Sequence, residues 1–174
     1  MTIKKILVPV DGSAQSVKAV ELASDIASKY DAEIILLQVL LRGHMPEGLR
    51  KAIEVEVGPR AGSKSGHLVN MPQEIMARVK DKKSTQLSVD ALEVIARYLL
   101  SKVSRLCHDK GVEKVTQIVE EGDPASIILN LAKATRADMI VMGSRGLGEL
   151  KGILLGSVSQ KVNQLAKCVC VTVK

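Results

Sequence analysis

Five short apolar runs, which alternate with segments of helical periodicity, are the feature that most constrains how this chain can fold. Continuous apolar runs of this length are typical of strands that are buried on both faces of a parallel sheet. The alternation predicts an α/β fold, in which a doubly wound, five-stranded, mostly parallel sheet carries helices on both faces. We expect the strands at residues 5–10, 33–40, 113–119, 138–142 and 169–173.

The segments between the strands predict four helices. Either Asp11 or Ser13 can cap the first one, in which apolar residues recur every three or four positions. Gly111 is typical of a helix C-cap, and Asp123 followed by Pro124 is typical of a helix start. We expect these helices after the Asp11 or Ser13 cap through residues 17–30, within 84–110, over 123–135 and over 157–165.

Aromatic residues are almost absent from the 174-residue chain, which has no Phe, no Trp and only Tyr30 and Tyr98. The core must therefore consist of aliphatic residues and Met, and the chain lacks the aromatic platforms on which single-stranded nucleic acid stacks. The formal net charge is +6, and residues 41–83, with nine basic and five acidic residues, contribute most of it. Because the remainder is nearly neutral, we do not expect nucleic acid as a partner.

Residues 41–83 interrupt the regular pattern with glycines, prolines and basic residues. An irregular link of this length inside a compact domain is typical of a functional or mobile segment. We therefore expect one domain over residues 1–174, with a basic, mobile insertion at about 41–83.

No apolar run approaches the length of a membrane span, about 18 residues, and the first run is too short for a signal peptide. We expect a cytoplasmic protein without membrane insertion. Its three cysteines, an odd number without a C-x-x-C pair, are expected as reduced, packed thiols. Cys168 and Cys170 would point to the same face of the last strand, where neighbours form a poor disulfide pair.

Glycines at a fixed spacing follow the fourth predicted strand: Gly143-x2-Gly146-x9-Gly156-Ser157. Such turns let backbone N–H groups converge on an anion, and the helix that begins at Ser157 presents further free N–H groups. Arg145 can add a positive charge. The arrangement therefore suits a polyphosphate, although the glycines could instead only shape a loop and Ser157 could only cap a helix.

The spacing G-x2-G-x9-G-[S/T] resembles the ATP-binding motif of the universal stress protein family, in its nucleotide-binding branch. The opening strand and acidic turn, residues 6–13, resemble the start of that family. The resemblance covers residues 1–40 and 84–174. It implies a Rossmann-like fold similar to the adenine nucleotide alpha hydrolases. Two departures are the long basic link and Val169, where family members often carry Pro.

The resemblance also implies a binding site for ATP, with Mg²⁺ held only through the nucleotide phosphates. Asp11 would lie near the ribose or adenine, although chemistry alone also allows it as a simple helix cap. Val39 would contact adenine through its backbone. The full set of implied contacts runs over the first, second and fourth strand ends and the last helix: Pro9, Asp11, Ser13, Val39, Met142, Gly143, Arg145, Gly146, Gly156, Ser157 and Val158.

Other chemistry is sparse in the sequence. The three histidines, His44, His67 and His108, show no metal-ligand spacing, and neither G-x-x-x-x-G-K-[ST] nor G-x-S-x-G is present. No base is placed beside the glycine turn, so we expect no catalytic residue and at most slow ATP hydrolysis. The leading hypothesis is a nucleotide-binding regulatory protein of the stress response. The alternatives are a slow ATPase or nucleotidyl-transfer enzyme, and a module that binds an unknown protein partner through its basic insertion.

The last predicted strand alternates valines with Cys170 and Thr172 and is expected at a sheet edge. Unpaired edge groups favour pairing with a second copy, and the family resemblance also implies a homodimer through this strand. On the sequence alone, proline at Val171 is expected to remove a ladder donor and weaken association.

Overall fold

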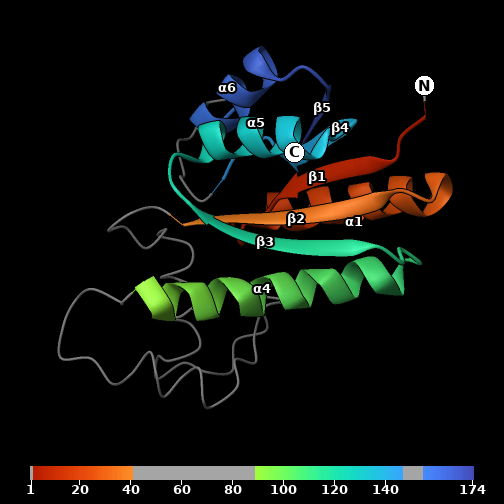
Figure 1. Cartoon of the computed structure of the whole chain (residues 1–174), viewed down its shortest axis with the longest axis horizontal. Coiled ribbons are helices and arrows are strands. Elements are labelled where there is room, and N and C mark those ends of the chain that lie inside the picture. The colour runs from red at the N-terminus through yellow and green to blue at the C-terminus, as the bar shows by residue number, and fades with distance from the viewer. Residues whose placement is uncertain (1, 41–88, 147–154) are drawn as a thin grey trace.

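The computed structural model describes residues 2–40, 89–146 and 155–174 (Figure 1). The insertion expected at 41–83 therefore lies outside the described residues. The elements alternate along the chain as the sequence predicts. They are β1 (Lys5–Pro9), α1 (Ala14–Tyr30), β2 (Glu33–Leu40), α4 (Val89–Asp109), β3 (Val115–Glu121), α5 (Pro124–Thr135), β4 (Met139–Gly143), α6 (Ser157–Leu165) and β5 (Val169–Val173).

The strands form one five-stranded sheet in the order β3-β2-β1-β4-β5, and every neighbouring pair is parallel. The doubly wound α/β fold is thereby confirmed. β3 begins two residues later than predicted, because Val112 still closes α4: its N–H donates to the Cys107 carbonyl and its side chain is buried. The strand then extends to Glu121, which lies opposite Leu40.

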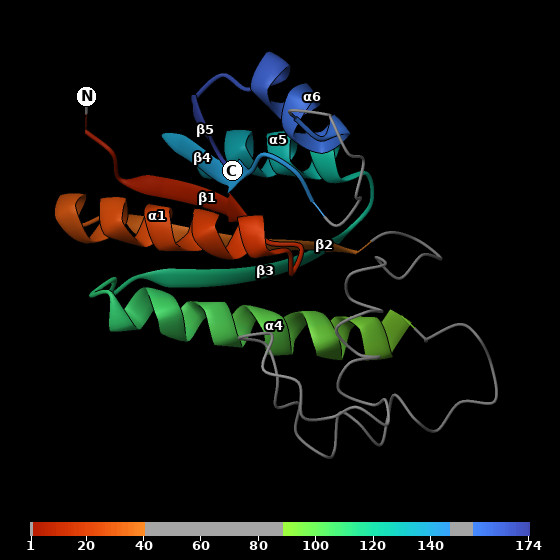
Figure 2. The same ribbon diagram turned by 180° about the vertical axis from the view of Figure 1, so that it is seen from behind.

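Helices lie on both faces of the sheet (Figures 1 and 2). A separate apolar cluster lies on each face, and we call them the α1/α4 cluster and the α5/α6 cluster. On one face α1 and α4 cover every second residue of the central strands, such as Ile6, Val8 and Leu36. On the other face α5 and α6 cover the residues between them, such as Leu7 and Ile140. Both sides of each central strand are therefore buried, which explains the continuous apolar runs.

The structure shows which residue caps the amino end of each of three helices, α1, α5 and α6. Ser13 is the N-cap of α1, because its hydroxyl accepts a hydrogen bond from the Ser16 N–H at 3.1 Å. Asp123 caps α5 as predicted, and hydrogen bonds from Ser126 hold the pKa of its carboxyl below the usual value. Ser157 does not cap α6: Gly156 occupies that position, and Ser157 is the first helical residue.

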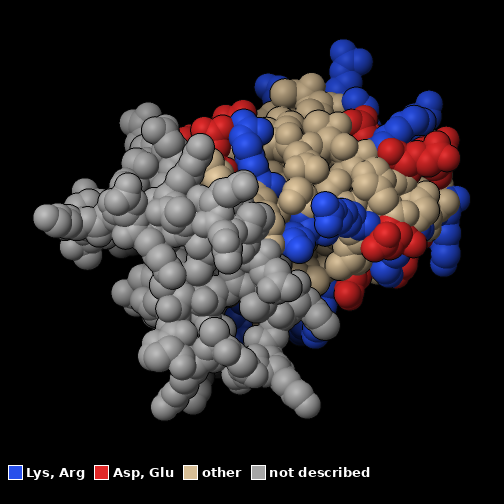
Figure 3. Space-filling model, turned by 90° about the horizontal axis from the view of Figure 1, so that it is seen from below, with Lys and Arg blue, Asp and Glu red and all other residues tan. Residues whose placement is uncertain are grey.

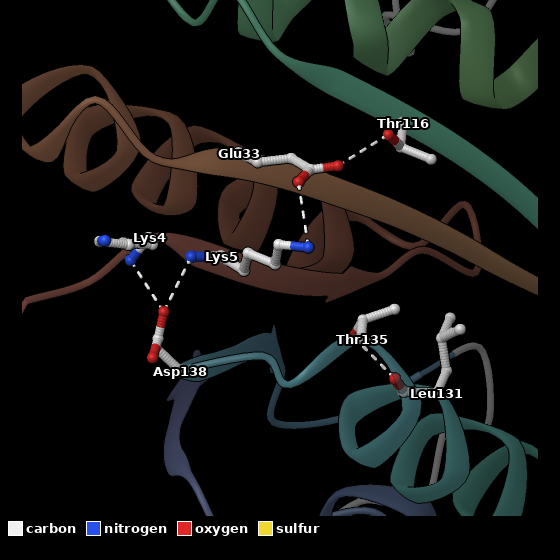
Figure 4. Close-up of polar contacts among 7 residues, drawn as sticks. All are labelled: Lys4, Lys5, Glu33, Thr116, Leu131, Thr135 and Asp138. Carbon is white, nitrogen blue, oxygen red and sulfur yellow. Dashed lines mark hydrogen bonds and ion pairs between the residues drawn. The ribbon is translucent and has the colours of Figure 1, made fainter.

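Polar contacts link the strands at the amino edge of the sheet (Figure 4). One carboxylate oxygen of Asp138 accepts hydrogen bonds from the Lys4 and Lys5 N–H groups, at 2.8 and 3.0 Å. Glu33 forms an ion pair with Lys5 at 3.6 Å and accepts a hydrogen bond from the Thr116 hydroxyl at 2.9 Å. The beginnings of β1, β2, β3 and β4 are therefore joined by side chains as well as by the ladder.

The β5 strand lies at one edge of the sheet, next to β4. Its Val169 N–H donates to the Asp138 carbonyl, and its Val173 carbonyl accepts from the Ser144 N–H. Backbone groups alternate in direction along a strand, so the Val171 N–H also points toward β4. Proline at Val171 would therefore remove a donor of the β4–β5 ladder and not one of the free edge, where the outward N–H groups belong to Cys170 and Thr172.

Acidic and basic side chains are interspersed over the described surface in the view of Figure 3. Several form exposed pairs, such as Lys110 with Asp25 and Lys161 with Asp123. Pairs of this kind contribute little to stability. None of the described helices is both long and apolar enough to span a membrane.

Candidate functional site

The carboxyl edge of the sheet opens between β1 and β4. The ladder between these strands contains only two pairs, Ile6 with Met139 and Leu7 with Ile140, although both strands continue beyond them. β1 is also where the strand order reverses, since the chain proceeds to β2 on one side and reaches β4 on the other. In doubly wound sheets ligands bind at this point.

Asp11 lies directly after β1 and is half-buried. Its Oδ1 atom accepts hydrogen bonds from the Ser13 N–H at 3.0 Å and from the Ser13 hydroxyl at 2.6 Å. The Ser13 hydroxyl in turn caps α1, so the start of the helix fixes the direction of the carboxylate. This leaves Oδ2 as the oxygen that faces the glycine turn.

The turn after β4 packs against Asp11 and the first turn of α1. A Cβ atom placed on Gly146 would lie 2.5 Å from Asp11 Oδ2, and one on Gly143 would lie 2.9 Å from the Gln15 Cβ. Contacts this short do not occur between real atoms, so a side chain at either position forces a shift: backbone atoms obstruct position 143, and the end of the Asp11 side chain obstructs position 146. The structure thus brings together Asp11 and Gly146, which lie far apart in the sequence.

The Ser144 peptide joins three elements at the base of the loop that leads to α6. Its N–H donates to the Val173 carbonyl at the end of β5, at 2.7 Å. Its carbonyl accepts from the Gly156 N–H at 2.8 Å and from the Ser159 hydroxyl at 2.7 Å. The start of α6 is therefore fixed to the end of β4.

Gly156 stands in a different environment from the other two motif glycines. Its φ of −72° and ψ of 162° suit any residue. A Cβ atom there would lie 3.5 Å or more from its neighbours, which is ordinary contact. Neither the backbone conformation nor the packing of the described residues thus explains why residue 156 is glycine. A ligand that approaches the main chain at this position would explain it.

The amino end of α6 carries no side-chain cap. The N–H groups of its first turn have no partner within the helix, and they carry a positive partial charge. Ser157 and Arg145 are both exposed beside this end, whereas Val158 is partly buried against the α5/α6 cluster. The end of α6 therefore offers main-chain donors, a hydroxyl and a guanidinium to an anion.

The remaining predicted contacts lie at the strand ends. Pro9 ends β1 and Val39 is the next-to-last residue of β2, and both are partly exposed. Met142 is 5% exposed and packs into the α5/α6 cluster, so only its main chain is left for a ligand. Within the described ranges, no group of three or more His, Cys, Asp and Glu side chains could hold a metal ion.

Sequence reasoning missed Ser144, Ser159 and Gln15. Ser144 and Ser159 are 1% and 2% exposed, and their hydrogen bonds fix both ends of the loop. Ser144 lies inside the glycine motif, which is the one signal that could have drawn attention to it. Gln15 carries no motif signal, because only the fold brings it against Gly143.

The fold, with its open carboxyl edge between β1 and β4, places this protein in the class of doubly wound α/β proteins. The chain matches the Usp family, the universal stress protein family, over residues 2–174. This protein therefore belongs to the universal stress protein family.

Two curated relatives span nearly the whole chain. Universal stress protein MJ0531 of Methanocaldococcus jannaschii is 33% identical over 171 residues, which are 98% of this chain and 82% of the relative. Universal stress protein YxiE of Bacillus subtilis is 33% identical over 164 residues, which are 94% of each chain.

Solved structures share the fold. Hypothetical protein MJ0577 has a TM-score of 0.69 and 26% identity, with coverage of 100% of this chain and 97% of that chain. A universal stress protein in complex with cAMP has a TM-score of 0.60 and 20% identity, with 99% and 98% covered. The universal stress protein from Archaeoglobus fulgidus in complex with dAMP has a TM-score of 0.56 and 16% identity, with both chains fully covered.

Proposed function

We propose that this protein binds ATP at the carboxyl edge of its sheet and acts as a nucleotide-dependent regulatory protein of the stress response. The observation that carries the proposal is the position of Gly156, where the described structure leaves room for a side chain and the motif has none. The gap between β1 and β4 lies at the same edge. Two proteins of the same fold were solved with the adenine nucleotides cAMP and dAMP, which supports an adenine nucleotide as the ligand.

The chemistry at the site matches a nucleoside triphosphate in two parts. Main-chain donors of the turn and of α6, with Arg145 beside them, would hold the phosphates. The Oδ2 atom of Asp11 carries negative charge and would accept from ribose hydroxyls or the adenine amino group rather than face a phosphate. Mg²⁺ needs few protein ligands when phosphates bind it, so it would enter with ATP.

Replacing Gly156 by Val tests the phosphate assignment. A Cβ atom at this position makes only ordinary contacts with the described residues, and the branched side chain would occupy the space through which phosphate must approach the main chain. We expect MgATP to bind about tenfold more weakly, which corresponds to about 1.4 kcal/mol. Ser157→Ala should cost less, because it removes one hydroxyl and leaves the backbone donors in place.

Titration calorimetry with MgATP on the full chain measures both variants. Ser28→Ala, an exposed helical serine at the far end of α1, is the matched control and should bind as the unmodified chain does. Mass spectrometry of the denatured protein identifies any nucleotide that copurifies. Equal affinity in Gly156→Val and the control would show that the phosphates do not bind here.

A further inference from the structure

Two thiols lie together on the α6 side of the sheet and take no part in the proposed nucleotide site. Cys168 immediately precedes β5, and Cys170 lies within it, opposite Ile140 of β4. Both are partly exposed and both pack against the same α5/α6 cluster. The third cysteine, Cys107, belongs to α4 and is fully buried in the α1/α4 cluster on the other face. Cys168 and Cys170 therefore share one environment, and Cys107 lies in a different one.

The strand geometry favours bridging of this pair by an ion over a direct disulfide. Val169 between them is a strand residue, so their Cα atoms are about 6.6 Å apart, near the upper limit of about 6.8 Å for disulfides. A disulfide needs Cβ atoms about 3.8 Å apart. A metal–sulfur bond is about 2.3 Å long, so two sulfur atoms that bind one ion from opposite sides lie about 4.6 Å apart.

The ligand set indicates the kind of ion. Thiolates are soft ligands and select Cu(I) over hard cations, whereas structural Zn²⁺ takes four ligands. Within the ranges that the structure describes, no third Cys, His, Asp or Glu joins the pair in a group that could hold a metal ion. A two-thiol site of this composition suits an ion that accepts two sulfur ligands.

We propose that Cys168 and Cys170 together bind one soft monovalent cation of the Cu(I) type per chain. Each thiol releases its proton to solvent as its sulfur binds the ion, and no electron is transferred. The site lies at the start of β5, beside Asp138 at the amino edge of the sheet, and the glycine turn lies at the opposite edge. The two sites are therefore independent of each other.

Anaerobic titration of the full chain with the bicinchoninate complex of Cu(I) tests the proposal. The unmodified protein should withdraw one Cu(I) per chain, whereas Cys168→Ser and Cys170→Ser should each lose this transfer. Cys107→Ala and Gly156→Val are the matched controls and should retain it, with circular dichroism to verify that every variant is folded. The proposal is overturned if the folded protein withdraws no Cu(I), if either serine variant withdraws a full equivalent, or if a folded control loses the transfer.

Oxidation provides a second, independent measurement. Diamide treatment of the folded chain should leave Cys168 and Cys170 without a bond between them, as judged by peptide mass mapping. An intramolecular disulfide between the two would show that the sulfurs meet directly, and the argument for an ion-bridged pair would then fail.

Discussion

At the scale of single residues, the contact between Gly146 and Asp11 is the most informative feature of the site. The turn main chain packs directly against the Asp11 carboxylate, whose other oxygen is held by Ser13. A residue with a side chain at position 146 must therefore displace a group that the start of α1 has fixed. The glycine and the aspartate depend on each other, although neither one alone is an unusual residue in a loop.

We expect Gly146→Ala to lower the free energy of unfolding by about 1 kcal/mol, because Asp11 must give up a hydrogen bond with Ser13 as it moves. In an Asp11→Ala background the same change should cost nothing, since the obstructing carboxylate is gone. Urea denaturation of the two single variants and the double variant measures this coupling. Additive effects would show that the two residues do not contact each other in solution.

At the scale of elements, the two edges of the sheet have different roles. At the amino edge, Asp138, Glu33, Lys5 and Thr116 link neighbouring strands through side chains (Figure 4). At the carboxyl edge, β1 and β4 separate and glycines replace side chains. The amino edge thus links the strands through side chains, while the carboxyl edge carries the proposed nucleotide site.

Asp138→Ala should therefore reduce stability without reducing nucleotide affinity. It removes a charged acceptor from two backbone N–H groups, and we expect a loss of about 1.5 kcal/mol in the free energy of unfolding. Asp109→Ala, an exposed aspartate at the end of α4, is the control and should change stability by less than about 0.5 kcal/mol. Thermal and urea unfolding compare the two, and an equal effect of both changes would contradict the role of Asp138.

Most elements could be predicted from periodicity and caps alone. Residues 157–165 form the last helix as predicted, and Asp123 with Pro124 begins α5. The predicted start of β3 lies two residues before the observed one. The hydrogen bond that closes α4 at Val112 leaves no signal in the sequence. Gly156 as the cap of α6 was also missed, since a serine follows it and serine is the commoner capping residue.

The candidate site was only partly predictable, for a related physical reason. Motif spacing marks Gly143, Gly146 and Gly156, because their chemistry is local to one loop. The contacts of Gln15 and Ser159 depend on which segments the sheet order brings together. No spacing rule contains that information, so these residues emerge only from the fold.

At the scale of the whole molecule, the free edge of β5 bears on assembly. We propose a homodimer in which two copies pair along this strand, because the Cys170 and Thr172 backbone groups point away from β4. Thr172→Pro removes an outward donor and should shift the protein toward monomer, while the monomer fold survives. Val171→Pro should instead destabilise the sheet itself.

Sedimentation velocity at tens of micromolar distinguishes these outcomes. A dimer that persists in folded Thr172→Pro would place the interface elsewhere, and a monomeric unmodified chain would contradict the dimer altogether.

We also expect little ATP turnover by the whole molecule. Asp11 is the carboxylate that the structure places against the glycine turn, and Ser13 holds one of its oxygens, so it is poorly placed to activate water. Phosphate release should stay far below about 1 s⁻¹, the lower end of ordinary enzyme turnover. Steady turnover at that rate, abolished by Gly156→Val, would show that the protein is an enzyme.

The separation of the core into two clusters has a consequence for how the protein unfolds. Asp11 and Gln15 belong to the α1 side of the sheet, whereas Gly156 and Ser159 belong to the α6 side, and all four border one edge. A nucleotide there would contact both layers, which lie on opposite faces of the sheet. Its binding should therefore make the two layers open together, and amide exchange in α1 and α6 should slow by the same factor when the ligand is added.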